Sequence, residues 1–256
     1  MILNVPAYWM NSPNFGDALT PWLIKKITGH DAVWTNDHLA TKYMVTGSIL
    51  NDPLAETCIV WGSGIAHRDT YIRKPVEIKA VRGPRTREAV LRSGVECPEV
   101  YGDPALLLPR FIPRSLLTTN IYYKLGIIPH IADYNEVRLK YWDRKDVIVI
   151  DLMRSIESVV AQICSCEVLI SSSLHGIIVS HAYEKPCGWV KFSGKIIGDD
   201  TKYHDYFESV GRFDEPGPLN LEENNPPIEE IVDWIPKSTE LKIDLDKLYR
   251  ACPFIT

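Results

Sequence analysis

The chain has 256 residues, of which 45% are hydrophobic, 24% charged and 10% aromatic, a composition that excludes an intrinsically disordered protein. At about 150 residues per domain, this length accommodates one large domain or two small ones. The formal net charge is −5, but residues 214–246 hold ten acids against two lysines, whereas residues 65–92 hold eight Lys or Arg against three acids. The charge permits an anion-binding site, and the lack of a broad basic face argues against a nucleic-acid partner.

The sequence shows no signal for membrane insertion or metal binding. No apolar run approaches the ~18–20 residues that cross a bilayer, and the N-terminus lacks the pattern of a secretory signal. We therefore expect a cytoplasmic protein, with at most peripheral contact at the inner face of the plasma membrane. The cysteines form no CxxC pair and no zinc-ligand spacing, so we expect reduced thiols and no metal at Cys58, Cys97, Cys164, Cys166, Cys187 and Cys252.

Short apolar β-branched runs alternate with segments of helical periodicity. Strands are predicted at 1–5, 42–47, 57–62, 77–81, 146–150, 167–171 and 187–192. Helices are predicted at 14–28, 155–164, 228–235 and 244–251. Strands that are apolar throughout and separated by helices indicate parallel sheets covered on both faces. The predicted fold class is therefore α/β, with two Rossmann-like domains.

The alternation breaks at 109–121, where two prolines and the Thr-Thr-Asn of 118–120 interrupt both periods. We therefore predict an N-terminal domain over 1–118, carrying the basic stretch, and a C-terminal domain over 119–236. A tail helix within 237–256 is expected to pack back on the first domain. In doubly wound sheets, ligands bind beyond the carboxyl ends of the strands, so motifs at those positions are the candidates for chemistry.

The most informative segment is 167–186, in which a buried strand runs into three serines and then Leu174-His175-Gly176. His175 is expected in the first turn of a helix, where free N–H groups and the helix dipole favour an anion. The serine hydroxyls add donors, and Gly176 is expected to let a ligand approach the backbone. The alternative is a serine-capped helix with a partly buried histidine.

Two arginines follow another predicted strand, in the Val-Arg-Gly-Pro-Arg-Thr of 81–86. Arg82 and Arg85 are suited to bidentate capture of a carboxylate or phosphate. We interpret Arg87 and Arg92 as the solvated face of a surface helix.

Carboxylates and a histidine occupy three further loops. Asn14 and Asp17 open the first helix, where Asp17 could orient or deprotonate a hydroxyl; the alternative is a capping box. Asp103 follows a short strand after Gly102, and His130 lies within an apolar run.

Together these segments resemble the polysaccharide pyruvyl transferase family over roughly residues 8–211. The matching pieces are NFGD (14–17), GSG (62–64), RGPRT (82–86), GDPALLLP (102–109), IPHIAD (128–133) and SSSLHGIIVSHAYEKP (171–186). The stretch 198–211 looks most like the exopolysaccharide ketal-pyruvate transferases of that family.

The resemblance implies a fold similar to the two-domain, GT-B-like glycosyltransferases. It also implies transfer of pyruvate from phosphoenolpyruvate (PEP) to a sugar of a bacterial surface polysaccharide or exopolysaccharide, or of its lipid-linked precursor, forming a ketal, releasing phosphate and using no cofactor. His175 would be the general acid, with Asp17 as the second catalytic residue. The expected PEP contacts are Arg82, Arg85, Ser172, Ser173, Leu174, Gly176 and Lys191. The expected acceptor contacts are Asn14, Asp103, His130 and Lys202.

The chain departs from the family at Ser173, where many members carry a phosphate-binding arginine. Arg82, Arg85, Lys191 or Lys202 could supply the missing cation. Two alternative functions follow: a nucleotide-sugar-dependent glycosyltransferase that holds a ribose with Asp199 or Asp200, and a catalytically inactive relative that binds glycan.

Overall fold

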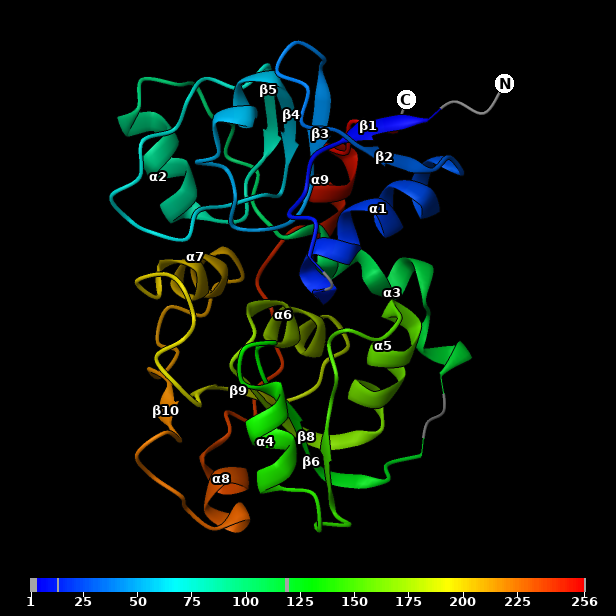
Figure 1. Ribbon diagram of the computed structural model, residues 1–256, viewed down its shortest axis with the longest axis vertical. Helices are drawn as coiled ribbons and strands as arrows, with labels where there is room; N and C mark the ends of the chain where they lie inside the picture. Colours follow the sequence, from blue (N-terminus) through cyan, green and yellow to red (C-terminus); the bar gives the residue numbers. More distant parts are fainter. Residues whose placement is uncertain (1–3, 13, 118–119, 256) are drawn as a thin grey trace. The chain divides into compact units, whose positions relative to one another are not determined.

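The computed structural model describes residues 4–12, 14–117 and 120–255. The chain is an α/β protein that divides into two compact units, each built on a five-stranded sheet (Figure 1). Unit 1 consists of Met1–Leu107, Gly198–Phe213 and Lys242–Thr256, and unit 2 of Leu108–Ile197 and Asp214–Leu241. Every strand pair in the described residues is parallel, as the apolar strand pattern predicted.

The sheet of unit 1 has the order β2-β1-β3-β4-β5. Its strands are β1 (Val5–Ala7), β2 (Ala32–Trp34), β3 (Lys42–Met44), β4 (Cys58–Trp61) and β5 (Glu77–Ala80). Its helices are α1 (Phe15–Thr28), α2 (Pro84–Arg92), α7 (Thr201–Ser209) and α9 (Leu245–Arg250), with 3₁₀ turns η1 (Pro53–Thr57) and η2 (Pro104–Leu107). Helix α1 ends at Gly29, whose φ of 75° is a left-handed conformation that glycine adopts without strain.

The sheet of unit 2 has the order β10-β9-β8-β6-β7. Its strands are β6 (Tyr123–Ile128), β7 (Val147–Val149), β8 (Cys166–Ser171), β9 (Cys187–Lys191) and β10 (Leu219–Asn220). Its helices are α3 (Leu108–Phe111), α4 (Tyr134–Lys140), α5 (Ile156–Cys164), α6 (Leu174–Ala182) and α8 (Ile228–Trp234), with the 3₁₀ turn η3 (Arg114–Leu116).

Each sheet reverses its winding direction at one strand. In unit 2 the chain passes from β6 to β7 on one side and then returns to β8 on the other. In unit 1 the same reversal occurs at β1, which lies between β2 and β3. Loops that leave neighbouring strands on opposite sides of such a point diverge and leave room for a ligand. The topology therefore favours a ligand site at the loops after β6 and β8.

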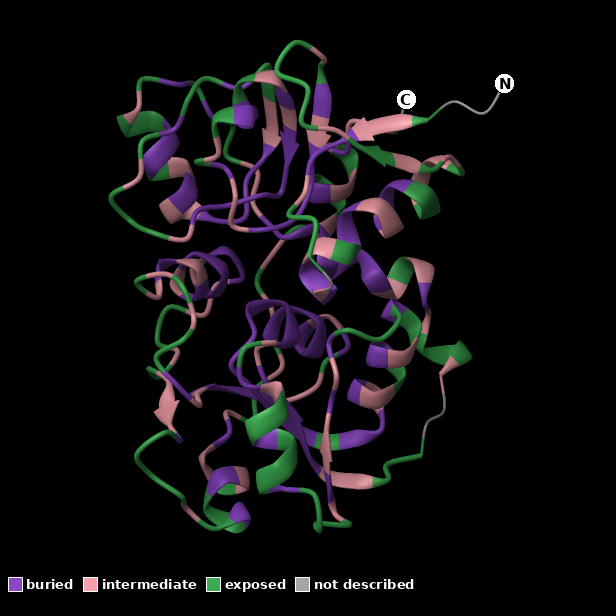
Figure 2. Cartoon of the chain, in the orientation of Figure 1, coloured by how far each residue is buried: buried purple, intermediate pink, exposed green. Residues whose placement is uncertain are grey.

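The hydrophobic core of each unit consists of strand and helix side chains, only part of which the periodicity identified, because β6, which supplies Leu125 and Ile127, is not among the predicted strands. In α5, Ile156, Val159, Val160 and Ile163 are all buried, and the Ser155 Oγ caps the helix by accepting from the Ser158 N–H at 3.3 Å. This helix and its cap confirm the prediction for 155–164. Figure 2 shows α6 as almost wholly buried and α4 as mostly exposed.

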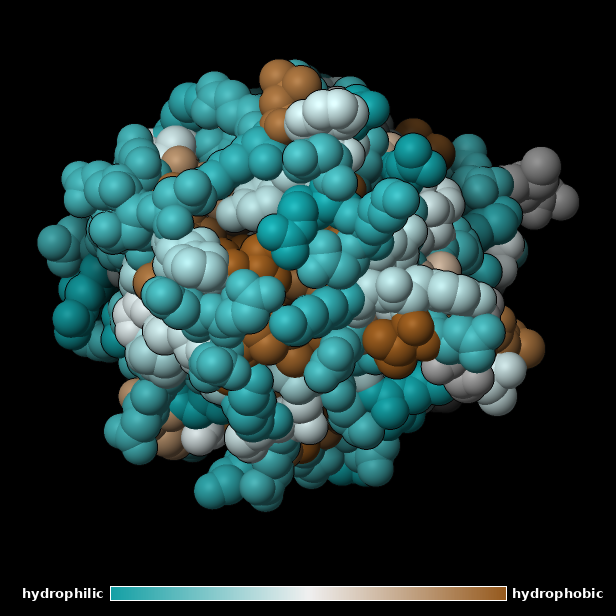
Figure 3. All heavy atoms as spheres, turned by 90° about the horizontal axis from the view of Figure 1, so that it is seen from below, coloured by the Kyte–Doolittle hydropathy of each residue, from teal (hydrophilic) through white to brown (hydrophobic). Residues whose placement is uncertain are grey.

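The face shown in Figure 3 is mostly hydrophilic, with hydrophobic residues in small separate patches. Within the described ranges, the structure contains no helix with the length and apolar character needed to span a membrane.

Each unit consists of more than one segment of the chain, so neither is a single contiguous domain. The predicted division near 109–121 corresponds to a change of unit at Leu107/Leu108, and 198–213 belongs to unit 1 and not to the C-terminal half. The last helix also belongs to unit 1, where the Trp61 Nε1 donates to the Leu248 carbonyl at 2.9 Å and Leu248 is fully buried.

Candidate active site

Three loops of unit 2 meet at the carboxyl edge of its sheet. The His130 N–H, after β6, donates to the Ser172 Oγ, after β8, at 2.9 Å. The Ser193 Oγ, after β9, donates to the Asp133 Oδ1 at 2.5 Å. These bonds fix the loops on both sides of the switch point between β6 and β8.

The serines after β8 shape the start of α6. The Ser171 Oγ accepts from the Ser173 N–H at 3.0 Å and lies 2.9 Å from the Ile128 carbonyl oxygen, to which it can donate. Ser173 is the N-cap residue but makes no side-chain cap bond, which contradicts the serine-capping alternative at this residue. His175 lies in the first turn and is 9% exposed. His175 is therefore a nearly buried imidazole in the first turn of a nine-residue helix, whose first N–H groups have no partner within the helix.

Gly176 has a packing role in this structure. A Cβ built on it would lie 2.3 Å from the Ser171 Oγ and 2.8 Å from the Ile128 Cγ2. Those distances are shorter than any ordinary contact, so a larger residue would push α6 away from the strand ends. Close packing of α6 on the sheet therefore accounts for a glycine at position 176. The prediction had given a different reason, the approach of a ligand to the backbone.

Asp133 is a candidate site residue that the sequence reasoning missed. It is 1% exposed, and its Oδ2 atom is buried with no hydrogen-bond partner among the described residues. A buried carboxylate oxygen without a donor is costly, and such atoms in native proteins call for an explanation such as a bound ligand. The signal was present in the Ile-Pro-His-Ile-Ala-Asp of 128–133, of which only the histidine was singled out.

His130 and Lys191 belong to the same edge. The Nδ1 of His130 accepts from the Ala132 N–H at 3.2 Å, which places the proton of the neutral ring on Nε2. Lys191 ends β9 two residues after Trp189, which pairs with Ser171, and its Nζ lies 5.9 Å from the centroid of the Trp189 ring. Of the four cations predicted to replace the missing arginine, Lys191 is the one that belongs to unit 2.

Arg82 of unit 1 is part of a buried network. Its Nε donates to the Asp205 Oδ2 at 3.0 Å, its Nη1 to the Ser48 Oγ at 2.7 Å and its Nη2 to the Ile65 carbonyl at 2.6 Å. The guanidinium is fully buried, and a Cβ on Gly64 would lie 2.5 Å from its Cζ. This arrangement favours a structural role for Arg82 over the predicted contact with PEP.

Four other positive charges of 65–92 also have acidic partners. The Nη2 of Arg85 donates to the Glu208 Oε1 at 2.7 Å, and that acid lies on α7 together with Asp205. Three more ion pairs involve this stretch: Arg73–Glu56, Lys79–Glu77 and Arg92–Asp69. Much of the local positive charge is therefore neutralised, which argues against an electrostatic membrane surface here.

The carboxylates predicted in unit 1 are engaged locally. The Ser12 Oγ donates to the Asp17 Oδ2 at 2.7 Å, and Asn14 makes no side-chain cap bond, so the capping-box alternative is wrong. Asp103 is fully buried and its Oδ1 accepts from the Ala105 N–H at 3.0 Å. Contact of Asn14, Asp17 and Asp103 with an acceptor stays a prediction.

Lys202 lies at the start of α7, with its Nζ 5.3 Å from the centroid of the Tyr203 ring. Burial, assisted by the charge of Arg82, lowers the pKa of Lys202 to about 8. The adjacent Asp199 accepts from the Arg68 N–H at 2.9 Å and the Thr201 N–H at 3.1 Å. This carboxylate is committed to backbone groups, which disfavours Asp199 as the ribose ligand of the glycosyltransferase alternative, while that role of Asp200 stays a prediction.

Comparison with known proteins places these motifs in a family. Residues 34–193 match the family model described as polysaccharide pyruvyl transferase. An uncharacterised protein of Acanthamoeba polyphaga mimivirus is 31% identical over 217 residues, covering 80% of this chain and 73% of that protein. The succinoglycan biosynthesis protein ExoV of Rhizobium meliloti is 28% identical over 222 residues, covering 80% of this chain and 65% of that protein.

One solved structure shows a similar fold. It is a functionally uncharacterised protein from Klebsiella pneumoniae, with a TM-score of 0.50 and 12% identity over 85% of this chain and 92% of that chain. This likeness concerns the fold alone, and the predicted similarity to GT-B-like glycosyltransferases stays a prediction. The family match covers more than half of the sequence and contains the loops after β6 and β8. The chain belongs to the polysaccharide pyruvyl transferase family.

Proposed function

We propose that this protein transfers pyruvate from PEP to two hydroxyls of a polysaccharide or of its lipid-linked precursor, forming a cyclic ketal and releasing phosphate. The observation that carries the proposal is the position of His175. It lies in the first turn of α6, directly after β8 at the point where the sheet of unit 2 reverses its winding.

The chemistry of PEP matches the groups at this edge. PEP carries a carboxylate and a phosphate, so its site requires fixed N–H donors and positive charge. The start of α6 offers the first, and Lys191, at the end of β9 in the same unit, would supply the second. Because Arg82 and Arg85 are committed to Asp205 and Glu208, Lys191 is our candidate for the phosphate partner.

The reaction begins with proton transfer to the methylene carbon of PEP. Protonated His175 donates this proton, and the electrons of the carbon–carbon double bond form the new C–H bond. One sugar hydroxyl oxygen bonds to the adjacent carbon, and Asp133 accepts the proton of that hydroxyl. The bond between this carbon and the bridging oxygen of the phosphate group then breaks, and phosphate leaves with the electron pair.

Ring closure completes the ketal. The second sugar hydroxyl bonds to the same carbon, and its proton returns to His175. The proton held by Asp133 leaves with phosphate or solvent. Each catalytic group is thereby restored, and the two hydroxyl protons balance the new methyl C–H bond and the released phosphate.

Ligand-induced stabilisation separates this proposal from its alternatives. At a concentration one hundred times its Kd, PEP should stabilise the fold by about 2.7 kcal/mol, seen as a higher Tm. Nucleotide sugars should have no such effect. Incubation with PEP and an acceptor oligosaccharide should then yield phosphate and a product heavier by one pyruvate ketal in the mass spectrum. Stabilisation by nucleotide sugars alone, or silence to both ligands, would contradict the proposal.

A further inference from the structure

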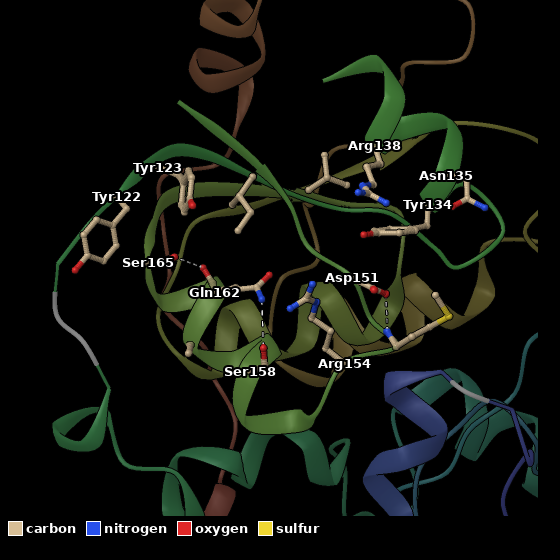
Figure 4. Close-up of a pocket in the computed structure, with 14 residues that line it drawn as sticks. Tyr122, Tyr123, Tyr134, Asn135, Arg138, Asp151, Arg154, Ser158, Gln162 and Ser165 are labelled. Atoms are coloured by element: carbon tan, nitrogen blue, oxygen red, sulfur yellow. Dashed lines mark hydrogen bonds between the residues drawn. The ribbon is translucent and has the colours of Figure 1, made fainter. Parts of the chain in front are cut away.

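A polar pocket lies in unit 2, along the outer edge of β7 (Figure 4). Its volume is about 860 Å³, within the range of small-ligand sites. One wall comes from α4 and the other from α5, and the residues after β7 close one end. Because β7 is the edge strand of the sheet and three residues long, no neighbouring strand fills this space.

Two arginines from different elements point into the pocket. Arg138 comes from α4 and Arg154 from the loop after β7, and Figure 4 shows both guanidinium groups directed into the space between the two helices. Within residues 120–255, neither side chain has a hydrogen bond or an ion pair. Arg144 of the same unit differs, because it forms a bidentate pair with Asp146. Asp151 also lines the pocket, and its Oδ1 accepts from the Met153 N–H at 2.9 Å. Two arginines against one aspartate leave a positive lining, and two guanidinium groups facing one space are suited to a carboxylate or phosphate.

The remaining lining suits a saccharide. The rings of Tyr123 and Tyr134 present flat apolar faces against which the C–H face of a pyranose packs. Asn135 and Gln162 add amide donors and acceptors for hydroxyls. A peptide strand paired with β7 fits less well, because the edge is short and carries charged side chains on both sides.

The pocket begins next to the candidate active site. Tyr134 directly follows Asp133, the buried carboxylate after β6. We propose that this pocket binds an acidic saccharide, with its carboxylate held between Arg138 and Arg154. The identity of this saccharide rests on the proposed function: it is the part of the acceptor that is not pyruvylated.

The direct test is a calorimetric titration without PEP, using a uronic-acid oligosaccharide and its carboxyl-reduced neutral analogue as probes. Arg138→Gln and Arg154→Gln should each raise the Kd for the acidic probe at least tenfold. Arg144→Gln is the matched control, because it removes the same charge from an exposed arginine outside the pocket, and it should leave the Kd unchanged. The neutral analogue should bind the wild type at least tenfold more weakly than the acidic probe.

Equal affinity of the wild type and both pocket variants would overturn the proposal, as would equal affinity for the two probes. The titration involves no catalysis, so its outcome is independent of pyruvate transfer. If the acidic probe binds as expected but no acceptor is pyruvylated in the presence of PEP, the proposed function fails and the pocket assignment stands. If transfer occurs, Arg138→Gln should raise the KM for an acidic acceptor and leave kcat and the KM for PEP unchanged.

Discussion

The Arg82 Nε lies 3.0 Å from the Asp205 Oδ2, and both side chains are fully buried although the residues are 123 positions apart in the chain. The same carboxylate accepts from the Thr86 N–H at 2.9 Å and from the Thr86 Oγ at 2.6 Å. A Cβ on Gly83 would lie 1.9 Å from the Asp205 carbonyl oxygen. The Arg-Gly-Pro-Arg-Thr motif therefore holds α7 against α2, which explains why 198–213 belongs to unit 1.

Replacing one member of the Arg82–Asp205 pair should lower the free energy of unfolding. Asp205→Asn leaves the Arg82 charge buried without a counter-charge, which typically costs about 3–5 kcal/mol of unfolding free energy. Arg85→Gln, at the partly exposed Arg85–Glu208 pair, is the control and should cost about 1 kcal/mol or less. Urea denaturation of both variants checks this. Equal, small losses in the two variants would contradict a structural role for the buried pair.

Lys202 should make stability depend on pH. Its pKa in the folded protein is lowered from 10.5 to about 8, mainly by burial and further by the Arg82 charge. Between about pH 8 and pH 10.5 the unfolded chain binds more protons at this lysine than the folded one, so its contribution to stability improves as pH rises through that window. Below pH 8 the folded protein carries the full cost of the buried charge.

The comparison with Lys202→Met isolates this effect from other groups that titrate at high pH. Urea midpoints of both proteins should show the variant gaining most over the wild type at pH 7, with the gain shrinking by pH 10. A stability difference that stays constant from pH 7 to pH 10 would show that the ammonium of Lys202 is not disfavoured by its surroundings.

Asp133 should be required for turnover and not for folding. In Asp133→Asn the amide oxygen can still accept from the Ser193 Oγ, so the contact between the loops is kept while the carboxylate is lost. Losing a positioned base typically costs about 10²–10⁴ in rate, and kcat should fall by that factor with little change in Tm. Ser193→Ala is the control that breaks the loop contact and keeps the carboxylate. Asp17→Asn should be assayed in the same experiment. If Asp133→Asn turns over at the wild-type rate and Asp17→Asn does not, the general base is Asp17 and not Asp133.

The local patterns predicted more of the fold than of the site. Helix α5, its Ser155 cap and strands such as β4, β8 and β9 follow from short-range periodicity, whereas β6, where the sheet of unit 2 reverses its winding, is not among the predicted strands. The segment exchange between units depends on Arg82 and Asp205, a pair that no local period reveals. A charge at a strand end predicts a partner but does not say which one, so the sequence alone does not separate a substrate contact of Arg82 from its buried pair with Asp205. Asp133 was missed because its unpartnered oxygen is a property of three-dimensional packing.

The role of His175 as the proton donor is tested by comparing the turnover of His175→Gln with that of His181→Gln, each measured on a preparation whose Tm is known. Both histidines lie in α6, His175 in the first turn and His181 in the buried last turn. His175→Gln should keep a Tm near the wild type and still bind PEP, while kcat for pyruvate transfer falls about 10²–10⁴-fold. His181→Gln should lower the Tm while the folded fraction turns over normally. A stable His175→Gln protein that transfers pyruvate at the wild-type rate would contradict the account.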